Sequence, residues 1–127
     1  MRLMQELYKI TGVVVHGENR GKSLGFPTAN IRLGVKIPEG IYAGSVAVNG
    51  KIYYAASFIG SAKTFQQTDI KLESYLFDFS GDLYGKSIIV RLYKKIRDNK
   101  EFASVEELVA RMHKDTEEIR EFLVKNQ

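Results

Sequence analysis

The sequence predicts a mainly β domain, an antiparallel barrel or sandwich, that ends in one α-helix. Several short apolar stretches alternate with turn signals, which is typical of such folds. The dipeptide Asn49–Gly50 is the strongest of these signals, because a type I′ hairpin turn requires positive φ at both of its central residues. A helical spacing of hydrophobic residues begins only after residue 104. We therefore expect a β unit followed by a single helix.

Five strands are expected, over residues 10–15, 41–48, 51–58, 70–79 and 87–96. Valine, isoleucine, threonine and aromatic residues are frequent in these stretches, and they favour the extended backbone. The segment 16–40, which contains several glycines and both prolines, is expected to be a loop region, and a second loop is expected at 59–69. A loop as long as the first is usually functional when it belongs to a compact domain.

A helix is expected from about residue 105 onward. Ser104 and Glu107 have the spacing of a capping box, in which each side chain bonds a backbone N–H at the start of a helix. Asp115 and Thr116 interrupt the apolar stripe, so a bend or a polar contact is expected there. We expect this helix to cover one side of the β unit. Its apolar stripe consists of Val105, Leu108, Val109, Met112, Ile119, Phe122 and Leu123.

The composition is that of an ordinary globular domain. A chain of 127 residues suffices for one domain with a substantial core, and we expect one domain over residues 1–127. We expect no membrane span and no secretory signal, because no apolar run is long enough for either. The absence of cysteine excludes disulfides and thiolate metal sites and fits a cytoplasmic protein. The formal charge of +4 suits an anionic ligand, but a solvated surface explains it equally well.

The segment 12–31, GVVVHGENRGKSLGFPTANI, is the part of the sequence most suggestive of ligand binding. Its glycines let the backbone approach a ligand, and Arg20 and Lys22 add positive charge for a phosphate. Thr28 and Asn30, separated by one residue, carry hard oxygen donors that suit Mg²⁺ bound with a nucleotide. The glycine spacing matches neither a Walker A motif nor a Rossmann fingerprint. A phosphate-binding loop and a glycine-rich hairpin loop without a ligand are both compatible with this pattern.

Glu73 is the acidic side chain best placed for proton transfer. A carboxylate among aromatic side chains is poorly solvated, which makes it a better proton acceptor near neutral pH. The alternative is structural, with Glu73 paired to a lysine across the sheet. Strand alternation places Glu73 on one face with Lys71, Tyr75, Phe77 and Phe79.

Beyond these local patterns, the sequence resembles the riboflavin kinase (flavokinase) family over nearly its whole length. The stretch GENRGKSLGFPTANI, with its PTAN tetrapeptide, is similar to the family signature. Further motifs follow in the family's order and at about its spacing. They are Gly40–Ile41–Tyr42–Ala43–Gly44, Ile59–Gly60, Thr64–Phe65, Glu73, Asp78–Phe79, Asp82–Leu83–Tyr84–Gly85, Arg97 and Phe102.

The resemblance implies both a fold and a reaction. The implied fold is a six-stranded antiparallel Greek-key β-barrel with a C-terminal α-helix. The implied reaction is ATP-dependent phosphorylation of the ribityl 5′-hydroxyl of riboflavin to give FMN and ADP. Mg²⁺ is the metal that the resemblance implies, with Zn²⁺ as an alternative in this family. We expect the chain to act as a monomer on these small molecules, with neither nucleic acid nor a membrane as partner.

The resemblance also implies roles for single residues around the phosphates. Glu73 matches the family's catalytic glutamate, which accepts the proton of the 5′-hydroxyl. Thr28 and Asn30 match the residues that hold the metal on the nucleotide, and Gly17 and Lys22 match the loop that lies over the phosphates.

Six further positions match residues that contact the two substrates. The implied ATP contacts are Leu76, Asp78 and Tyr84. The implied flavin contacts are Arg97, Lys100 and Phe102. Structural alternatives exist for most of them: core packing for Leu76, Tyr84 and Phe102, and a solvated loop for the two basic residues.

Two positions depart from the family pattern. Lys63 stands where the bacterial members usually have proline, and Phe58 stands where they commonly have a polar residue. We therefore expect the loop around residues 61–65 to differ near the flavin, with consequences for affinity and closure rather than for the reaction type.

Two other functions are compatible with the sequence. One is a flavin- or nucleotide-binding protein without turnover, and the other is a β-barrel that binds single-stranded nucleic acid by stacking on aromatic residues. A zinc site is not expected, because His16 and His113 are far apart and no cysteine is present.

Overall fold

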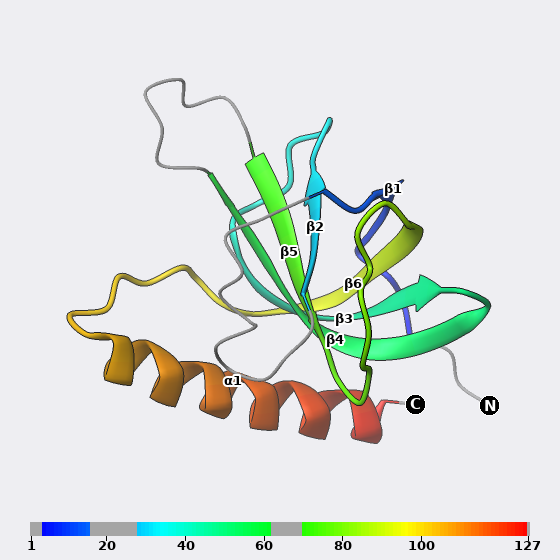
Figure 1. Cartoon of the computed structure of the whole chain (residues 1–127). Coiled ribbons are helices and arrows are strands. Elements are labelled where there is room, and N and C mark those ends of the chain that lie inside the picture. The colour runs from blue at the N-terminus through cyan, green and yellow to red at the C-terminus, as the bar shows by residue number, and fades with distance from the viewer. Residues whose placement is uncertain (1–3, 16–27, 62–69, 127) are drawn as a thin grey trace.

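The structure, a computed structural model, describes residues 4–15, 28–61 and 70–126. Within these ranges six strands form one curled antiparallel sheet, and one helix lies across its outer face (Figure 1). The predicted six-stranded antiparallel barrel with a C-terminal helix is confirmed. The elements are β1 (Tyr8–Val13), β2 (Thr28–Arg32), β3 (Gly40–Val48), β4 (Lys51–Ser61), β5 (Ile70–Leu76), β6 (Ser87–Arg97) and α1 (Val105–Lys125).

The order of strands in the sheet is β1-β6-β3-β4-β5-β2, so β1 and β2 are the two edges. The sheet curls until these edges approach each other. The N–H of Val15 donates to the carbonyl oxygen of Asn30 at 2.8 Å, just beyond the end of β1. Val15 and Thr28, the described residues on either side of segment 16–27, therefore both lie close to Asn30.

The two elements with the clearest local signals form as predicted. Asn49 and Gly50 have φ of 53° and 77°, as a type I′ turn between β3 and β4 requires. Ser104 caps α1, because its hydroxyl accepts from the N–H of Glu107 at 3.2 Å. The carboxylate of Glu107 accepts in turn from the N–H of Ala103 at 3.2 Å. Within the described residues no helix has the length and apolar character needed to span a bilayer.

Two expected loops contain strand residues, and these expectations were wrong. Residues 28–32 of the predicted loop 16–40 form β2, because Ala29 and Ile31 are buried in the core when this short segment pairs with β5. The first residues of the predicted loop 59–69 belong to β4, which continues to Ser61 because it pairs with β5 as far as Ile70.

The predicted strand 70–79 is shorter than expected. Residues 70–76 alternate as predicted, with Leu72 and Leu76 in the barrel and Tyr75 on the helix side. The strand ends at Leu76 because Asp78 adopts φ of 58°, the left-handed conformation of a turn. As a result Phe79 packs against the barrel core, although alternation assigned it to the face of Glu73.

The sheet separates two hydrophobic cores. One core fills the curled interior, and the other lies between the outer face and α1. Burial of apolar area contributes about 25 cal/mol per Å², so both faces of the sheet stabilise the fold. The largest fully buried side chains of the inner core are Tyr42, Ile59, Leu72, Leu76, Ile88 and Leu92, and those of the outer core are Phe77, Ile119 and Leu123.

Gly44 allows β3 and β6 to come close where their register shifts. A Cβ at this position would overlap the backbone carbonyl oxygen of Arg91 in β6. We predict that Gly44→Ala lowers the free energy of unfolding by about 1–3 kcal/mol, because a backbone atom cannot move aside as a side chain does. Urea denaturation measures this change.

Gly34→Ala is the matched control. No atom lies within 4 Å of a Cβ built at Gly34, so the same substitution there leaves stability unchanged or slightly raised. If both variants unfold at the wild-type urea concentration, the two strands are not held as closely as described.

Candidate functional site

A single row of residues crosses five of the six strands on the helix-facing side of the sheet. Directly paired residues of antiparallel strands point to the same face, so these side chains share one surface. Neighbouring strands are about 4.8 Å apart, which separates the strand backbones at Glu73 and Arg97 by roughly 14 Å. The row consists of Asn30 in β2, Glu73 in β5, Phe58 in β4, Ile41 in β3 and Arg97 in β6.

The next row on the same face contains Thr28, Tyr75, Ala56, Ala43 and Lys94. Thr28 therefore lies beside Asn30 on β2, as the spacing in the sequence predicts. The sheet brings three of the predicted site residues, Thr28, Asn30 and Glu73, together at its β2 edge.

Glu73 is almost fully buried, with 8% of its surface exposed. Its cross-strand neighbours are Asn30 and Phe58, so the register does not give the cross-strand lysine of the structural alternative. The hydroxyl of Tyr75 donates to Oε1 of Glu73. A buried carboxylate requires such hydrogen bonds, because its charge has lost most of its hydration.

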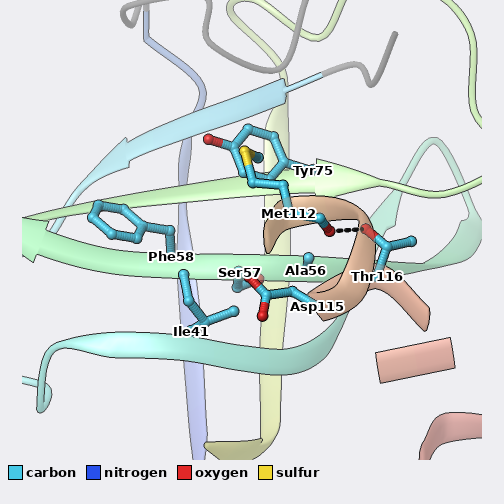
Figure 2. A pocket seen from close by; sticks show the side chains of 8 residues that line it. All are labelled: Ile41, Ala56, Ser57, Phe58, Tyr75, Met112, Asp115 and Thr116. Carbon is cyan, nitrogen blue, oxygen red and sulfur yellow. Dashed lines mark hydrogen bonds between the residues drawn. The ribbon is translucent and has the colours of Figure 1, made fainter. Parts of the chain in front are cut away.

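A small pocket lies between α1 and strands β3–β5, next to Glu73 along the row (Figure 2). Its volume of about 20 Å³ is enough for one water molecule. A larger ligand therefore fits only if side chains in its wall move. The wall is formed by Ile41, Ala56, Ser57, Phe58, Tyr75, Met112, Asp115 and Thr116.

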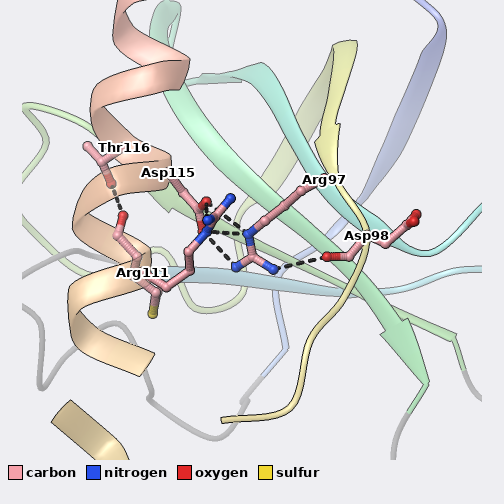
Figure 3. Close-up of polar contacts among 6 residues, drawn as sticks. Arg97, Asp98, Arg111, Asp115 and Thr116 are labelled. Carbon is pink, nitrogen blue, oxygen red and sulfur yellow. Dashed lines mark hydrogen bonds and ion pairs between the residues drawn. The ribbon is translucent and has the colours of Figure 1, made fainter. Parts of the chain in front are cut away.

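Asp115 connects α1 to the far end of the row. It is 3% exposed, and its carboxylate lies between two guanidinium groups (Figure 3). Arg97 donates through Nη2 to Oδ2 at 2.7 Å and through Nε to Oδ1 at 2.9 Å. Arg111, one turn earlier in the helix, donates to Oδ1 at 3.1 Å. The polar contact expected at Asp115 is therefore an ion pair with the last residue of β6.

The three predicted flavin contacts lie together, with Arg97 at the end of β6 and Lys100 and Phe102 in the segment that follows it. The guanidinium of Arg97 and the ammonium of Lys100 are each 5.8 Å from the centre of the Phe102 ring. Nδ2 of Asn99 donates to the carbonyl oxygen of Ile59 at 3.1 Å, which ties this segment to β4. The ammonium of Lys95 donates to Asp98 at 2.6 Å, and this hydrogen bond lowers the pKa of the Asp98 carboxyl.

The three predicted nucleotide contacts, unlike the flavin contacts, differ in their surroundings. Leu76 is completely buried in the barrel core, in agreement with its structural alternative. Asp78 and Tyr84 are exposed, and Oδ2 of Asp78 lies 3.4 Å from Nη1 of Arg120. For Tyr84 the structural alternative, packing in the core, is therefore wrong. Gly17, Lys22 and Lys63 lie outside the described residues.

The residues at the β2 edge fit a hard divalent cation. The Thr28 hydroxyl and the Asn30 amide oxygen lie on one face beside the carboxylate of Glu73, and all three are oxygen donors. Within the described parts of the chain no cluster of three or more His, Cys, Asp or Glu residues is suited to a metal. Such a sparse set of oxygen donors suits Mg²⁺, which keeps several waters and binds phosphates, better than Zn²⁺.

Two residues of this surface, Tyr75 and Met112, were not among the site residues predicted from the sequence. Tyr75 was placed on the face of Glu73, but alternation does not show that its hydroxyl reaches the carboxylate. Met112 was assigned to the apolar stripe, and the structure puts it in the pocket wall beside the Tyr75 ring (Figure 2). Their common signal is an apolar or aromatic residue on the face that carries Glu73.

A family model and curated relatives both indicate one family. The family model for flavokinase, described as riboflavin kinase, matches residues 4–123. The bifunctional riboflavin kinase/FMN adenylyltransferase of Bacillus subtilis is 39% identical over 122 residues, which are 91% of this chain and 39% of that protein. The chain thus spans about two fifths of the length of this relative.

Two solved structures share the fold. A riboflavin kinase from Trypanosoma brucei superposes with a TM-score of 0.65 at 29% identity, covering 92% of this chain and 80% of the other. A Streptococcus pneumoniae structure described as a macrolide-efflux protein superposes with a TM-score of 0.79 at 36% identity. That match covers 88% of this chain but 38% of the other, so it concerns one part of the larger protein.

We predict that Asp115→Asn lowers the free energy of unfolding by about 3 kcal/mol, because it leaves two guanidinium groups without the buried carboxylate that pairs with them. Urea denaturation of the variant measures the loss. The matched control is Glu121→Gln in the same helix, which removes an exposed i,i+4 pair with Lys125 at 3.1 Å. Exposed pairs contribute little, so the control changes stability by less than about 0.5 kcal/mol. Equal, small effects in both variants would contradict the central role of Asp115.

Proposed function

The chain belongs to the riboflavin kinase family, and from this premise we propose that it transfers the γ-phosphoryl group of ATP to the ribityl 5′-hydroxyl of riboflavin. The products are FMN and ADP. The observation that supports this proposal most strongly is the row from Asn30 through Glu73 to Arg97 on one surface. We propose that its Asn30 end lies beside the phosphates and its Arg97 end beside the flavin.

In this proposal the flavin ring occupies the enlarged pocket between α1 and the sheet. Ile41, Phe58 and Met112 offer apolar contacts to the ring, and Arg97 with Phe102 borders the site at the β6 end. The ribityl chain extends along the row toward β5. The roughly 14 Å between the strand backbones at Arg97 and Glu73 suits a ligand that has a flat ring at one end and a reactive hydroxyl at the other.

Glu73 is the proposed base. The 5′-oxygen forms a bond to the γ-phosphorus while the bond from that phosphorus to the β,γ-bridging oxygen breaks, and Glu73 accepts the hydroxyl proton. Thr28 and Asn30 are proposed to hold the nucleotide together with Mg²⁺, which when bound neutralises charge on the terminal phosphates. Because Asn30 pairs directly with Glu73, the acceptor hydroxyl and the phosphates meet at the β2 edge.

The relatives named above carry a second activity in their names, that of an FMN adenylyltransferase. The chain covers 39% of the Bacillus subtilis protein, and the proposed site accounts only for phosphoryl transfer. We assign the kinase reaction alone to residues 4–123.

We predict that Glu73→Gln lowers kcat by roughly two to four orders of magnitude, because the amide keeps the shape of the side chain but accepts no proton. FMN formation followed by chromatography measures the rate. The control is the affinity for Mg–ADP and for riboflavin, which stays within about threefold if only the base is lost. Near-normal turnover would exclude Glu73 as the base, and a large fall in melting temperature would point to a structural role.

We predict that Thr28→Ala and Asn30→Ala weaken binding of Mg–ADP at least tenfold while riboflavin affinity changes less than about threefold, because both oxygens face the nucleotide side. Calorimetry with each ligand separately measures the two affinities. Thr11→Ala, on the exposed part of β1, is the matched control and changes neither. Equal losses for both ligands would mean that the β2 edge had merely collapsed.

A further inference from the structure

The side chain of Tyr75 connects the pocket to Glu73. Its ring packs in the outer core with Ile41 and Phe77, forms part of the pocket wall, and is 7% exposed. Its hydroxyl donates to Oε1 of Glu73, two residues earlier on the same strand. One residue therefore contacts both the space proposed for the flavin and the carboxylate proposed as base.

A carboxylate on a flexible side chain needs a fixed orientation to accept a proton efficiently. Glu73 has three rotatable side-chain bonds, and rotation about the last one turns both oxygens away from an incoming hydroxyl. A hydrogen bond to Oε1 fixes the plane of the carboxylate and the direction of its oxygens. The donor is itself held, because the Tyr75 ring is packed between the sheet and α1 (Figure 2).

We propose that Tyr75 is a positioning residue for the phosphoryl transfer, in which its hydroxyl holds the Glu73 carboxylate in the orientation that receives the 5′-hydroxyl proton. This inference rests on the proposed function. Tyr75 itself takes no proton and forms no bond to the substrate phosphorus. Tyr75 lies in the row that contains Thr28, and Glu73 lies in the neighbouring row on the same face of the sheet. The Tyr75 hydroxyl therefore reaches the carboxylate along this face.

Tyr75→Phe tests the inference, since it keeps the ring and removes only the hydroxyl. We expect kcat for FMN formation to fall about tenfold to a hundredfold, while KM for riboflavin and for ATP stays within about threefold. The split between kcat and KM is decisive, because a residue that only shapes the pocket changes the KM for riboflavin instead.

Tyr93→Phe is the matched control. Its ring also packs against the outer core, and its hydroxyl lies 2.9 Å from Oγ of Ser45 instead of near Glu73. The same loss of a hydroxyl at this position leaves kcat unchanged. Melting temperatures of both variants are measured alongside, so that a loss of folded protein is not counted as a loss of rate.

The double variant Glu73→Gln with Tyr75→Phe shows whether Tyr75 acts through Glu73. If it does, adding Tyr75→Phe to Glu73→Gln lowers kcat no further. The inference is overturned if the two losses multiply, if Tyr75→Phe alone leaves kcat unchanged, or if it raises the KM for riboflavin at constant kcat. A wild-type chain that makes no FMN at all would instead overturn the proposed function.

Discussion

The buried ion pair between Asp115 and Arg97 is the interaction on which the arrangement of the site depends. A carboxylate in the middle of an apolar helix face loses its hydration, so it is tolerated only if cations replace the lost water. Arg97 and Arg111 supply them with hydrogen bonds of 2.7–3.1 Å. A bidentate guanidinium–carboxylate pair adds a directional constraint to this apolar packing. The pair therefore fixes which residues of α1 face the row.

The outer core and the candidate site use the same surface of the sheet. Where α1 covers β3, β4 and β6, the side chains form a mainly apolar core, and toward the β2 edge the surface becomes polar. Glu73 lies at this boundary, with the apolar Phe58 on one side and the amide of Asn30 on the other. Apolar packing on one side limits the access of water to Glu73, and polar side chains lie on its other side. This environment suits the proton transfer to Glu73 that we propose.

The sequence predicts those features that depend on nearby residues. The hairpin at Asn49–Gly50, the cap at Ser104 and the face of Glu73 all follow from local rules, and the structure agrees with each. β2 was missed because it becomes a strand only by pairing with β5, which is distant in sequence. The alignment of the row from Asn30 to Arg97 could not be predicted from the sequence either, because the register of β3 with β6 shifts twice before Arg97. Residue types thus indicate the members of the site, and nonlocal pairing decides their order.

The proposed function requires a flavin ring to enter a pocket that is small, so some of the described elements around it must move. Moving α1 away from the sheet would separate Asp115 from Arg97, and breaking a buried pair costs about 3–5 kcal/mol. Phe58 and Met112 can change rotamer without breaking this pair, and methionine adapts its shape easily. Side-chain movement is therefore the less costly route. The ion pair therefore keeps the helix in register while the pocket wall adapts, and Phe58, which directly neighbours Glu73, lies where that adaptation reaches the proposed base.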